Sequence, residues 1–228
     1  SKKPYSITLS LADRIDTLIG FFGVNEKPSS SKDPYALRRV AQGIIRILIE
    51  NKKDIKINDI ISYSSNVYLD QGFKFSNKEL TKDISNFLKD RYKYYLKEKD
   101  FRYDIIEASS KTLNLNKISM TYKKAKSLNK IINKQIGEDI ISSYKRAFNI
   151  LSSEIKNNNK ILTNITDPGI FKNDFEQALF KKTNELRQYF SGITQKQNFD
   201  ETLIFLATAK KEIFDFFNNV KVNDDSEV

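Results

Sequence analysis

Residues 11–39 read LADRIDTLIGFFGVNEKPSSSKDPYALRR, and this stretch predicts a helix, a connection and the start of a second helix. Its first part has apolar residues at three- and four-residue intervals, which predicts a helix with one buried face. Gly20 and Gly23 loosen the end of that helix, and Pro28 with the serines after it predicts a connection. Asp33 is suited to cap a second helix and Pro34 to occupy its first position, where a missing N–H is tolerated. The buried face of the first helix is expected to contain Leu11, Ile15, Leu18, Ile19 and Phe22.

The same periodicity predicts helices along most of the chain. After Pro34 we expect an apolar stripe of Leu37, Val40, Ala41, Ile44, Ile45, Leu48 and Ile49. Further helices are expected from Asn77 to about residue 97, at 101–108, 120–133, 136–157 and 170–190, and as one last helix beyond a turn at 191–197. Residues 51–61 are expected to be a polar break, 62–77 an irregular crossing and 157–168 a loop. The predicted fold class is all-α.

The periodicity also predicts which faces of the later helices are buried. In the helix at 136–157 the buried face is expected to contain Ile136, Ile140, Ile141, Tyr144, Ala147, Phe148 and Leu151. In the helix at 170–190 it is expected to contain Phe171, Phe175, Ala178, Leu179, Leu186 and Phe190. The last helix is expected to face inward through Leu203, Leu206, Ala209, Ile213 and Phe217.

Composition excludes several classes of site. The 228 residues are 39% hydrophobic and 12% aromatic, as in a folded chain, but they contain no Cys and no His. The usual zinc sites and the Ser-His-Asp and Cys-His nucleophile systems therefore cannot form. No Gly-rich nucleotide-binding motif is present, although a Mg²⁺ site made only of carboxylates remains open. No apolar run approaches the roughly 20 residues that cross a bilayer, and no secretory signal is recognised.

The balance of charge favours a polyanionic partner. The formal net charge is +10 and the pI is about 9.4. Such a charge attracts nucleic acid. A chain rich in Lys, Asn and Ile is also what an AT-rich genome produces, so charge alone does not identify an RNA-binding protein.

Two motifs in the opening stretch resemble the β subunit of bacterial two-subunit glycyl-tRNA synthetases. They are LADRIDTLIGFF, from Leu11 to Phe22, and SKDPYALRR, from Ser31 to Arg39. The similarity continues through Ala41, Gly43 and 45–47. Three later segments resemble the family in the same order: FLKDRYKYYLKEKDFRYDIIEA at 87–108, SYKRAFNILSSE at 143–154 and FDFFNNVKVNDD at 214–225. Residues 54–76 and 111–119 match it poorly.

This resemblance implies three regions in a C-terminal part of a longer, cytoplasmic subunit, which fits a chain that begins SKKPYS without Met. Residues 1–32 would end an HD-like domain, 33–118 would form a helical linker domain, and 119–228 an anticodon-binding bundle of the DALR type. That bundle would lack its last helix, so Phe214, Phe216, Phe217 and Val220 are expected to be partly exposed. The region would bind tRNA-Gly and be non-catalytic.

The resemblance also implies partners and cofactors. The α subunit of an α₂β₂ tetramer would use ATP and Mg²⁺ to attach glycine to tRNA-Gly, and no cofactor is expected in this chain. Two alternatives stay open. One is a scaffold that holds the α and β subunits together without touching RNA. The other is the remnant of an HD-type metal-dependent phosphohydrolase, because Asp13 in LADRID resembles the last aspartate of such sites, although a capping or packing role is favoured for it.

Seven residues are candidates for contact with tRNA. Lys145, Arg146 and Asn149 are expected on the face of the 136–157 helix that is not buried, where Arg could bind phosphate or base edges and Asn could read a base. Arg91 and Lys93 lie in a segment where tyrosines alternate with cations, a pattern that suits RNA but is also compatible with core packing. Arg38 and Arg39 begin a helix whose dipole disfavours cations, which suggests a specific partner such as an acidic residue.

Overall fold

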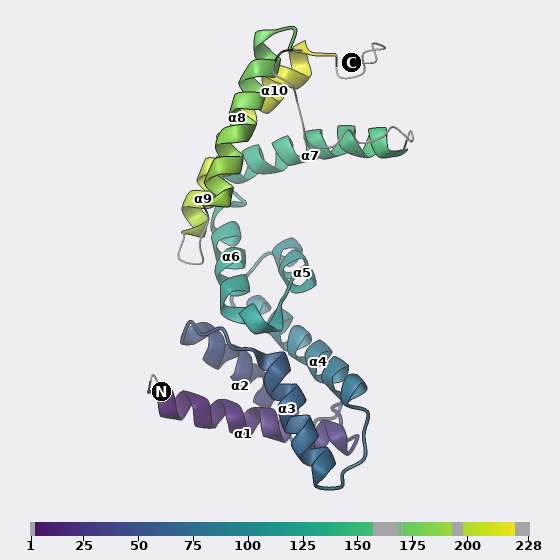
Figure 1. Ribbon diagram of the computed structural model, residues 1–228. Helices are drawn as coiled ribbons and strands as arrows, with labels where there is room; N and C mark the ends of the chain where they lie inside the picture. The colour runs from purple at the N-terminus through teal and green to yellow at the C-terminus, as the bar shows by residue number, and fades with distance from the viewer. Residues whose placement is uncertain (1–2, 157–168, 170, 193–197, 222–228) are drawn as a thin grey trace. The chain divides into compact units, whose positions relative to one another are not determined.

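The computed structural model describes residues 3–156, 169, 171–192 and 198–221, and these form helices and turns without a strand (Figure 1). The prediction of an all-α fold is therefore confirmed. The elements are α1 (Pro4–Gly23), α2 (Leu37–Glu50), α3 (Ile57–Asp70), α4 (Asn77–Lys97), α5 (Tyr103–Lys111), the 3₁₀ helix η1 (Leu115–Lys117), α6 (Ile118–Ile131), α7 (Gln135–Lys156), α8 (Asp174–Ser191), α9 (Phe199–Ala207) and α10 (Lys210–Asn219). None of the described helices is both long enough and apolar enough to cross a membrane.

The chain divides into two compact units, Ser1–Asn129 and Lys130–Val228. We call them the first unit and the second unit. The first unit contains α1 to α5, η1 and most of α6, and the second contains α7 to α10. The division into an HD-like remnant, a linker and an anticodon-binding bundle stays a prediction.

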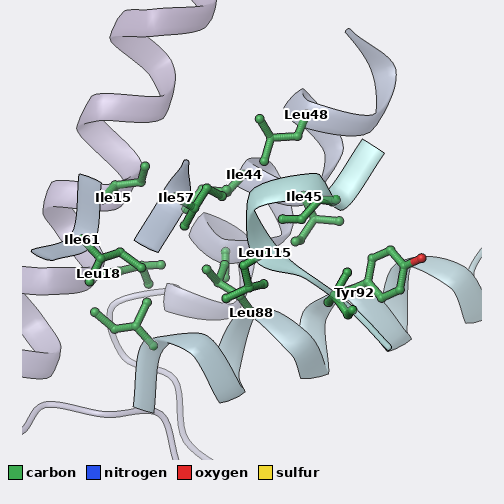
Figure 2. Packing of buried hydrophobic residues seen from close by; sticks show 14 of the residues in the cluster. Ile15, Leu18, Ile44, Ile45, Leu48, Ile57, Ile61, Leu88, Tyr92 and Leu115 are labelled. Carbon is green, nitrogen blue, oxygen red and sulfur yellow. The ribbon is translucent and has the colours of Figure 1, made fainter. Parts of the chain in front are cut away.

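The first unit is built around one apolar cluster, to which α1, α2, α3 and α4 contribute (Figure 2). Ile19, Ala41, Ile44, Ile45 and Leu96 have no exposed surface. All five residues expected on the buried face of α1 are buried, and so is the stripe of α2 apart from Val40, which is half-buried. At roughly 1.5–3 kcal/mol for each fully buried large side chain, this cluster supplies most of the favourable free energy of folding of the unit.

In the connection between α1 and α2, Asp33 is hydrogen-bonded to the start of α2 although three residues separate it from the helix. The Asp33 carboxylate accepts hydrogen bonds from the backbone N–H groups of Leu37 (2.8 Å) and Arg38 (3.0 Å). Asp33 therefore accepts the first N–H groups of the helix as predicted, but the N-cap residue is Ala36. The prediction that Pro34 is the first helical residue is wrong, since α2 begins at Leu37. The reason is a turn ending at Ala36, whose φ of 54° is left-handed and interrupts helical geometry.

Residues 57–70 form α3, so the predicted polar break at 51–61 is wrong from residue 57 on, and the predicted irregular crossing at 62–77 is wrong up to residue 70. Ile57, Ile61 and Ser65 recur every four residues and are buried. Ser65 satisfies its hydroxyl by donating to the carbonyl of Ile61 (2.7 Å). Burial against α1 and α4 outweighs the weak helix propensities of the Ser, Asn, Val and Tyr residues in this segment.

Asn77 is of a residue type that caps helices and was the expected cap of α4. Ser76 has this role instead, since its hydroxyl accepts the backbone N–H of Glu79 (3.4 Å). The buried face of α4 includes Tyr92, which the sequence analysis did not place in the core. The Tyr92 hydroxyl is hydrogen-bonded to that of Ser109 (2.8 Å), and burial raises the pKa of Tyr92 to about 12. This bond joins α4 to α5 inside the core.

The connection after α5 belongs to the first unit. Leu113, Leu115 and Ile118 are buried in its core. The Asp54 carboxylate accepts the backbone N–H groups of Ser119 (2.8 Å) and Met120 (3.4 Å), and so caps the start of α6. These contacts fix α6 on the first unit.

The second unit has little buried apolar surface. None of the residues of α8, α9 and α10 is fully buried in the part of the chain that the structure describes, although α8 packs on α10 and α7 on both α9 and α10. The predicted burial of Phe175, Ala178 and Phe190 is wrong, since all three are exposed. Helix α8 packs on α10, and this contact leaves part of the apolar face of α8 uncovered.

The predicted single last helix is broken after Ala207 into α9 and α10, with Thr208 and Ala209 at the break. The expected partial exposure of Phe214, Phe216, Phe217 and Val220 is confirmed, since all four are half-buried. The expected loop at 157–168 and most of the expected turn at 191–197 lie outside the described residues.

Candidate nucleic-acid interface

Helix α7 presents the apolar stripe that was expected to be buried. Tyr144 is 63% exposed, Phe148 50%, Leu151 48% and Ile155 50%, so the predicted inner face through Tyr144, Phe148 and Leu151 is wrong. The rings of Tyr144 and Phe148 are stacked, with centroids 5.5 Å apart and planes at 20°. Periodicity identifies such a stripe, but it does not tell which face of a helix a neighbour covers.

The face of α7 that packs on α10 is polar instead. Arg146 donates from Nη2 to Oδ1 of Asn218 (2.7 Å), and its guanidinium carbon lies 5.0 Å and 5.5 Å from the ring centroids of Phe214 and Phe217. An arginine side chain can replace apolar residues here, because its stem is apolar and its planar head stacks on aromatic rings. The expectation that Arg146 projects away from the bundle is therefore wrong.

A second polar contact joins the same two helices near their first turns. Lys210 Nζ donates to Oδ1 of Asp139 at 2.6 Å, and Gln135 Nε2 donates to the same oxygen at 2.7 Å. The hydrogen bond from Lys210 is the main reason that the pKa of Asp139 is below its usual value. Together with Arg146, this pair determines which face of α7 meets α10.

Lys145 and Asn149 remain exposed beside the stacked rings of α7. Neither side chain forms a hydrogen bond or ion pair with any residue that the structure describes. Residues three or four apart are neighbours on a helix, so Tyr144 lies beside Phe148, and Lys145 beside both Phe148 and Asn149. The four side chains therefore form a contiguous surface. We call these four residues the α7 platform. It combines two aromatic faces, one cation and one amide.

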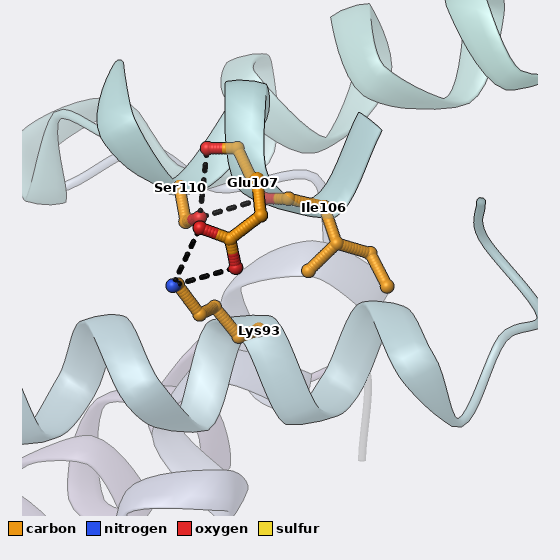
Figure 3. Close-up of polar contacts among 4 residues, drawn as sticks. All are labelled: Lys93, Ile106, Glu107 and Ser110. Carbon is orange, nitrogen blue, oxygen red and sulfur yellow. Dashed lines mark hydrogen bonds and ion pairs between the residues drawn. The ribbon is translucent and has the colours of Figure 1, made fainter. Parts of the chain in front are cut away.

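Lys93 is held in an ion pair between α4 and α5 (Figure 3). Its Nζ donates to both carboxylate oxygens of Glu107, at 2.8 Å and 3.1 Å. This hydrogen bonding raises the pKa of Lys93. On the same turn of α5, Ser110 donates to the carbonyls of Ile106 (2.6 Å) and Glu107 (3.1 Å). Lys93 thus has a structural partner, and a polyanion would have to compete for it.

Arg91 lies against aromatic rings of its own helix. Its guanidinium carbon is 5.7 Å from the ring centroid of Phe87 and 5.6 Å from that of Tyr94. Its Nε is buried and has no hydrogen-bond partner among the described residues. The sequence analysis left packing open as an explanation for Arg91, and these contacts support packing.

Arg38 and Arg39 are adjacent in sequence but differ in their contacts with the turn before α2. Arg38 donates from Nη2 to the carbonyl of Ser29 and, at 3.2 Å, to that of Ser30. Its partners are backbone carbonyls and not the acidic residue that was expected. Arg39 is exposed and its side chain has no partner in the described part of the chain.

Asp13 is not part of an acidic cluster among the residues that the structure describes. It is exposed in the middle of α1, where it neither caps the helix nor packs in the core, so the expected capping or packing role is wrong. Across the described residues, no group of three or more acidic side chains is close enough together to hold a metal ion.

One basic segment was not among the residues predicted to contact RNA. Residues 108–137 contain seven lysines and no Asp or Glu. The five that lie in the first unit are all exposed: Lys111, Lys117, Lys123, Lys124 and Lys126. The signal was visible in the sequence, because a stretch of 30 residues without one acid stands out in a chain with 29 acidic residues.

The two units differ in net charge as well. Residues 1–129 contain 25 Lys and Arg against 15 Asp and Glu, whereas residues 130–228 contain 14 of each kind. The whole formal charge of +10 therefore belongs to the first unit. Long-range attraction of a polyanion is expected from that unit and not from the second.

Comparison with known proteins finds one family over the first half of the chain and relatives with the same description over nearly all of it. Residues 1–111 match the family described as glycyl-tRNA synthetase beta subunit. The glycine–tRNA ligase beta subunit of Rickettsia prowazekii is 34% identical over 216 residues, which are 95% of this chain and 30% of that relative. The corresponding protein of Rickettsia canadensis is 37% identical over 217 residues, and that of Cereibacter sphaeroides 32% over 228 residues. The chain spans 30–32% of the length of these relatives.

Proposed function

Because this chain belongs to the glycyl-tRNA synthetase beta subunit family, we propose that it is a tRNA-binding region of a glycine–tRNA ligase beta subunit. In this proposal it positions tRNA-Gly and recognises its anticodon. The α subunit, as the partner in an α₂β₂ enzyme, uses ATP and Mg²⁺ to activate glycine and transfer it to the tRNA. The chain contributes binding energy and no reacting group, in keeping with its lack of Cys and His.

The α7 platform is the observation that carries this proposal. Single-stranded bases of an RNA loop are recognised by stacking on aromatic rings and by hydrogen bonds to their edges. Tyr144 and Phe148 offer two exposed, stacked rings, and Asn149 lies one residue beyond them. Lys145 adds a cation that suits the adjoining phosphate.

The chemistry of the platform fits the anticodon of tRNA-Gly. Glycine codons fix cytosine at two anticodon positions, so a reader of this anticodon must recognise cytosine. The amide of Asn149 has both an acceptor and donors, and the pairing edge of cytosine offers the complementary groups. Binding the anticodon far from the reacting ester raises the rate when that energy holds the tRNA end in register.

The scaffold hypothesis is the alternative, and one observation favours it. Leu151 and Ile155 continue the exposed stripe of Tyr144 and Phe148 at helical spacing. A stripe of this kind also suits an apolar helix of a protein partner. The two functions differ in which residues matter, because stacking needs the rings and helix docking needs the aliphatic residues as well.

Equilibrium binding of the chain to two transcripts tests the proposal. One transcript is tRNA-Gly, and the other has both anticodon cytosines replaced. We expect tighter binding of tRNA-Gly, and we expect Phe148→Ala to weaken it by about 1–3 kcal/mol, the usual cost of losing one base–aromatic stack. Leu151→Ala is the matched control on the same helix, since its side chain is exposed to a similar degree.

The outcomes separate the two functions. Equal affinity for both transcripts would contradict anticodon recognition. Normal RNA binding by Phe148→Ala, together with weaker assembly with the α subunit in both Phe148→Ala and Leu151→Ala, would support the scaffold instead.

A further inference from the structure

We propose that Lys117, Lys123 and Lys126 form a surface that binds the phosphate backbone of RNA without reading its bases. We call these three residues the lysine surface. The identity of the RNA rests on the proposed function, whereas the chemistry of the surface does not. This site lies in the first unit and shares no residue with the α7 platform.

The lysine surface is the most one-sided part of the charge distribution. It lies within residues 108–137, where lysines occur without a single carboxylate. Some lysines elsewhere in the first unit form ion pairs: Lys27 Nζ lies 2.6 Å from Oδ2 of Asp83, and Lys93 Nζ lies 2.8 Å from Oε1 of Glu107. Lys117, Lys123 and Lys126 form no ion pair with any residue in the described part of the chain. None of these three charges is therefore neutralised by an ion pair in that part of the chain.

Helix α6 holds these lysines on a fixed support. Ser119 at its start is buried and is capped by Asp54, and Ala125 is buried one and a half turns later. Between them, Tyr122 packs against Tyr95 and Phe101, with ring centroids 5.7 Å and 5.8 Å apart. The core therefore holds one side of α6 and leaves the lysines in solvent.

The spacing of the lysines suits a run of phosphates. Lys123 and Lys126 are three residues apart, so they are neighbours on one side of α6. Lys117 lies in η1, directly before α6, and continues the run of cations along the chain toward the start of the helix. Lysine ammonium groups bind phosphate as compact point charges on flexible stems, which tolerates variation in the path of the backbone.

Helix α6 itself offers no exposed aromatic ring, which favours backbone contact over base reading on this helix. Tyr122 is the one aromatic residue of α6, and its ring is engaged with Tyr95 and Phe101. An acidic protein surface is the other class of partner that lysines could bind. RNA is favoured, because it presents a continuous series of phosphates to a segment that is positive throughout.

The test compares two triple variants of the 228-residue chain at several salt concentrations. Lys117→Gln/Lys123→Gln/Lys126→Gln removes the lysine surface. Lys74→Gln/Lys78→Gln/Lys82→Gln removes the same charge from exposed positions of the first unit that lie near Glu79 and Asp83. The probes are the two tRNA transcripts that differ in the anticodon. Circular dichroism checks that both variants keep their helices.

We expect the lysine-surface variant to bind both transcripts at least about tenfold more weakly near 0.1 M salt. Its slope of log affinity against log salt should be shallower by about 2–3, since each lost phosphate contact contributes roughly 0.7–0.9. The control variant should change affinity by less than about threefold, because exposed charges beyond roughly 10 Å are largely screened at this salt.

Two results would overturn the lysine surface. One is an unaltered salt slope, and the other is equal weakening by both triple variants, which would mean that only net charge matters. These results are distinguishable from failure of the proposed function. If the unmodified chain binds both transcripts equally while the lysine-surface variant shows the expected shallower salt slope, only the anticodon role is rejected. If the unmodified chain prefers tRNA-Gly while the variant's salt slope is unchanged, only the lysine surface is rejected.

Discussion

The two units of this chain are both helical, yet they differ in how many apolar residues they bury and in their net charge. The first unit encloses a continuous core, most of whose residues come from α1, α2, α3 and α4, and it carries the whole net charge of +10. The second unit is neutral, and its described helices α8, α9 and α10 contain no fully buried residue. Apolar periodicity marks a core in the first unit, whereas on α7 it marks a surface.

The difference has a consequence for local stability. A segment with few buried apolar contacts opens more easily than a packed core. We therefore expect amide hydrogen exchange to be slower in α2 and α4 than in α8 and α9. Binding segments are often drawn from the less stable part of a protein, which agrees with an RNA-binding role for the second unit.

The largest expected effect is a cavity in the first unit. Ile45→Ala removes a side chain with no exposed surface and should cost about 2–5 kcal/mol. Leu151→Ala on α7 should cost less than about 0.5 kcal/mol, because that side chain is 48% exposed. Urea unfolding, with local exchange measured by mass spectrometry, compares the two. Similar losses would mean that Leu151 is buried and that the contrast between the units is wrong.

The next effect concerns the polar contact between α7 and α10. Arg146→Ala should destabilise the second unit by about 1–2 kcal/mol, since it removes a hydrogen bond to Asn218 and contacts with two rings. Lys145→Ala next to it should leave stability unchanged. Faster amide exchange in α10 is the measurement. If both variants behave alike, Arg146 does not hold the two helices together.

A smaller effect is expected for the ion pair between α4 and α5. Lys93→Met should cost about 0.5 kcal/mol at neutral pH, because the pair is partly exposed. The pKa of Lys93 is raised in the folded chain, so its contribution is complete below pH 10.5 and is lost as pH rises through the raised value. Unfolding curves of both proteins should therefore converge at high pH. A difference that persists there would show that packing of the lysine stem, and not its charge, is responsible.

The smallest effect concerns Asp139 on α7. Its pKa is lowered, mainly by the hydrogen bond from Lys210, so this contribution to stability is present above pH 3.8 and is lost as pH falls through the lowered value. Lys210→Met should move the pKa of Asp139 upward, as followed by NMR titration of its carboxyl carbon. An unchanged pKa would mean that Lys210 does not reach Asp139 in solution.

Much of the first unit could be predicted from the sequence, because a stripe of large apolar residues must be buried somewhere in a folded chain. The predicted buried face of α1 is correct at every residue, and that of α2 is correct at every residue except Val40, which is half-buried. The predictions that failed in this unit have identifiable physical causes. Helix α3 is stabilised by burial despite weak propensities, and α2 starts late because Ala36 adopts a left-handed conformation.

The candidate interface was harder to predict, because each contact there depends on a distant partner. Phe214 and Asn218 decide where Arg146 lies, and Glu107 decides where Lys93 lies. No local pattern reveals such pairs. By contrast, the lysine surface needed only a count of charges along the sequence, which shows that one-sided charge is a signal to be read before individual arginines.

The most direct test of the central claim, that this chain binds tRNA through α7, uses its lack of cysteine. Lys145→Cys gives a unique attachment point for a reagent that cleaves nearby RNA, and Lys78→Cys on α4 gives the matched control. We predict cleavage of tRNA-Gly in the anticodon loop from position 145 and none in that loop from position 78. Absence of cleavage from position 145, or the same cleavage pattern from both positions, would contradict the account.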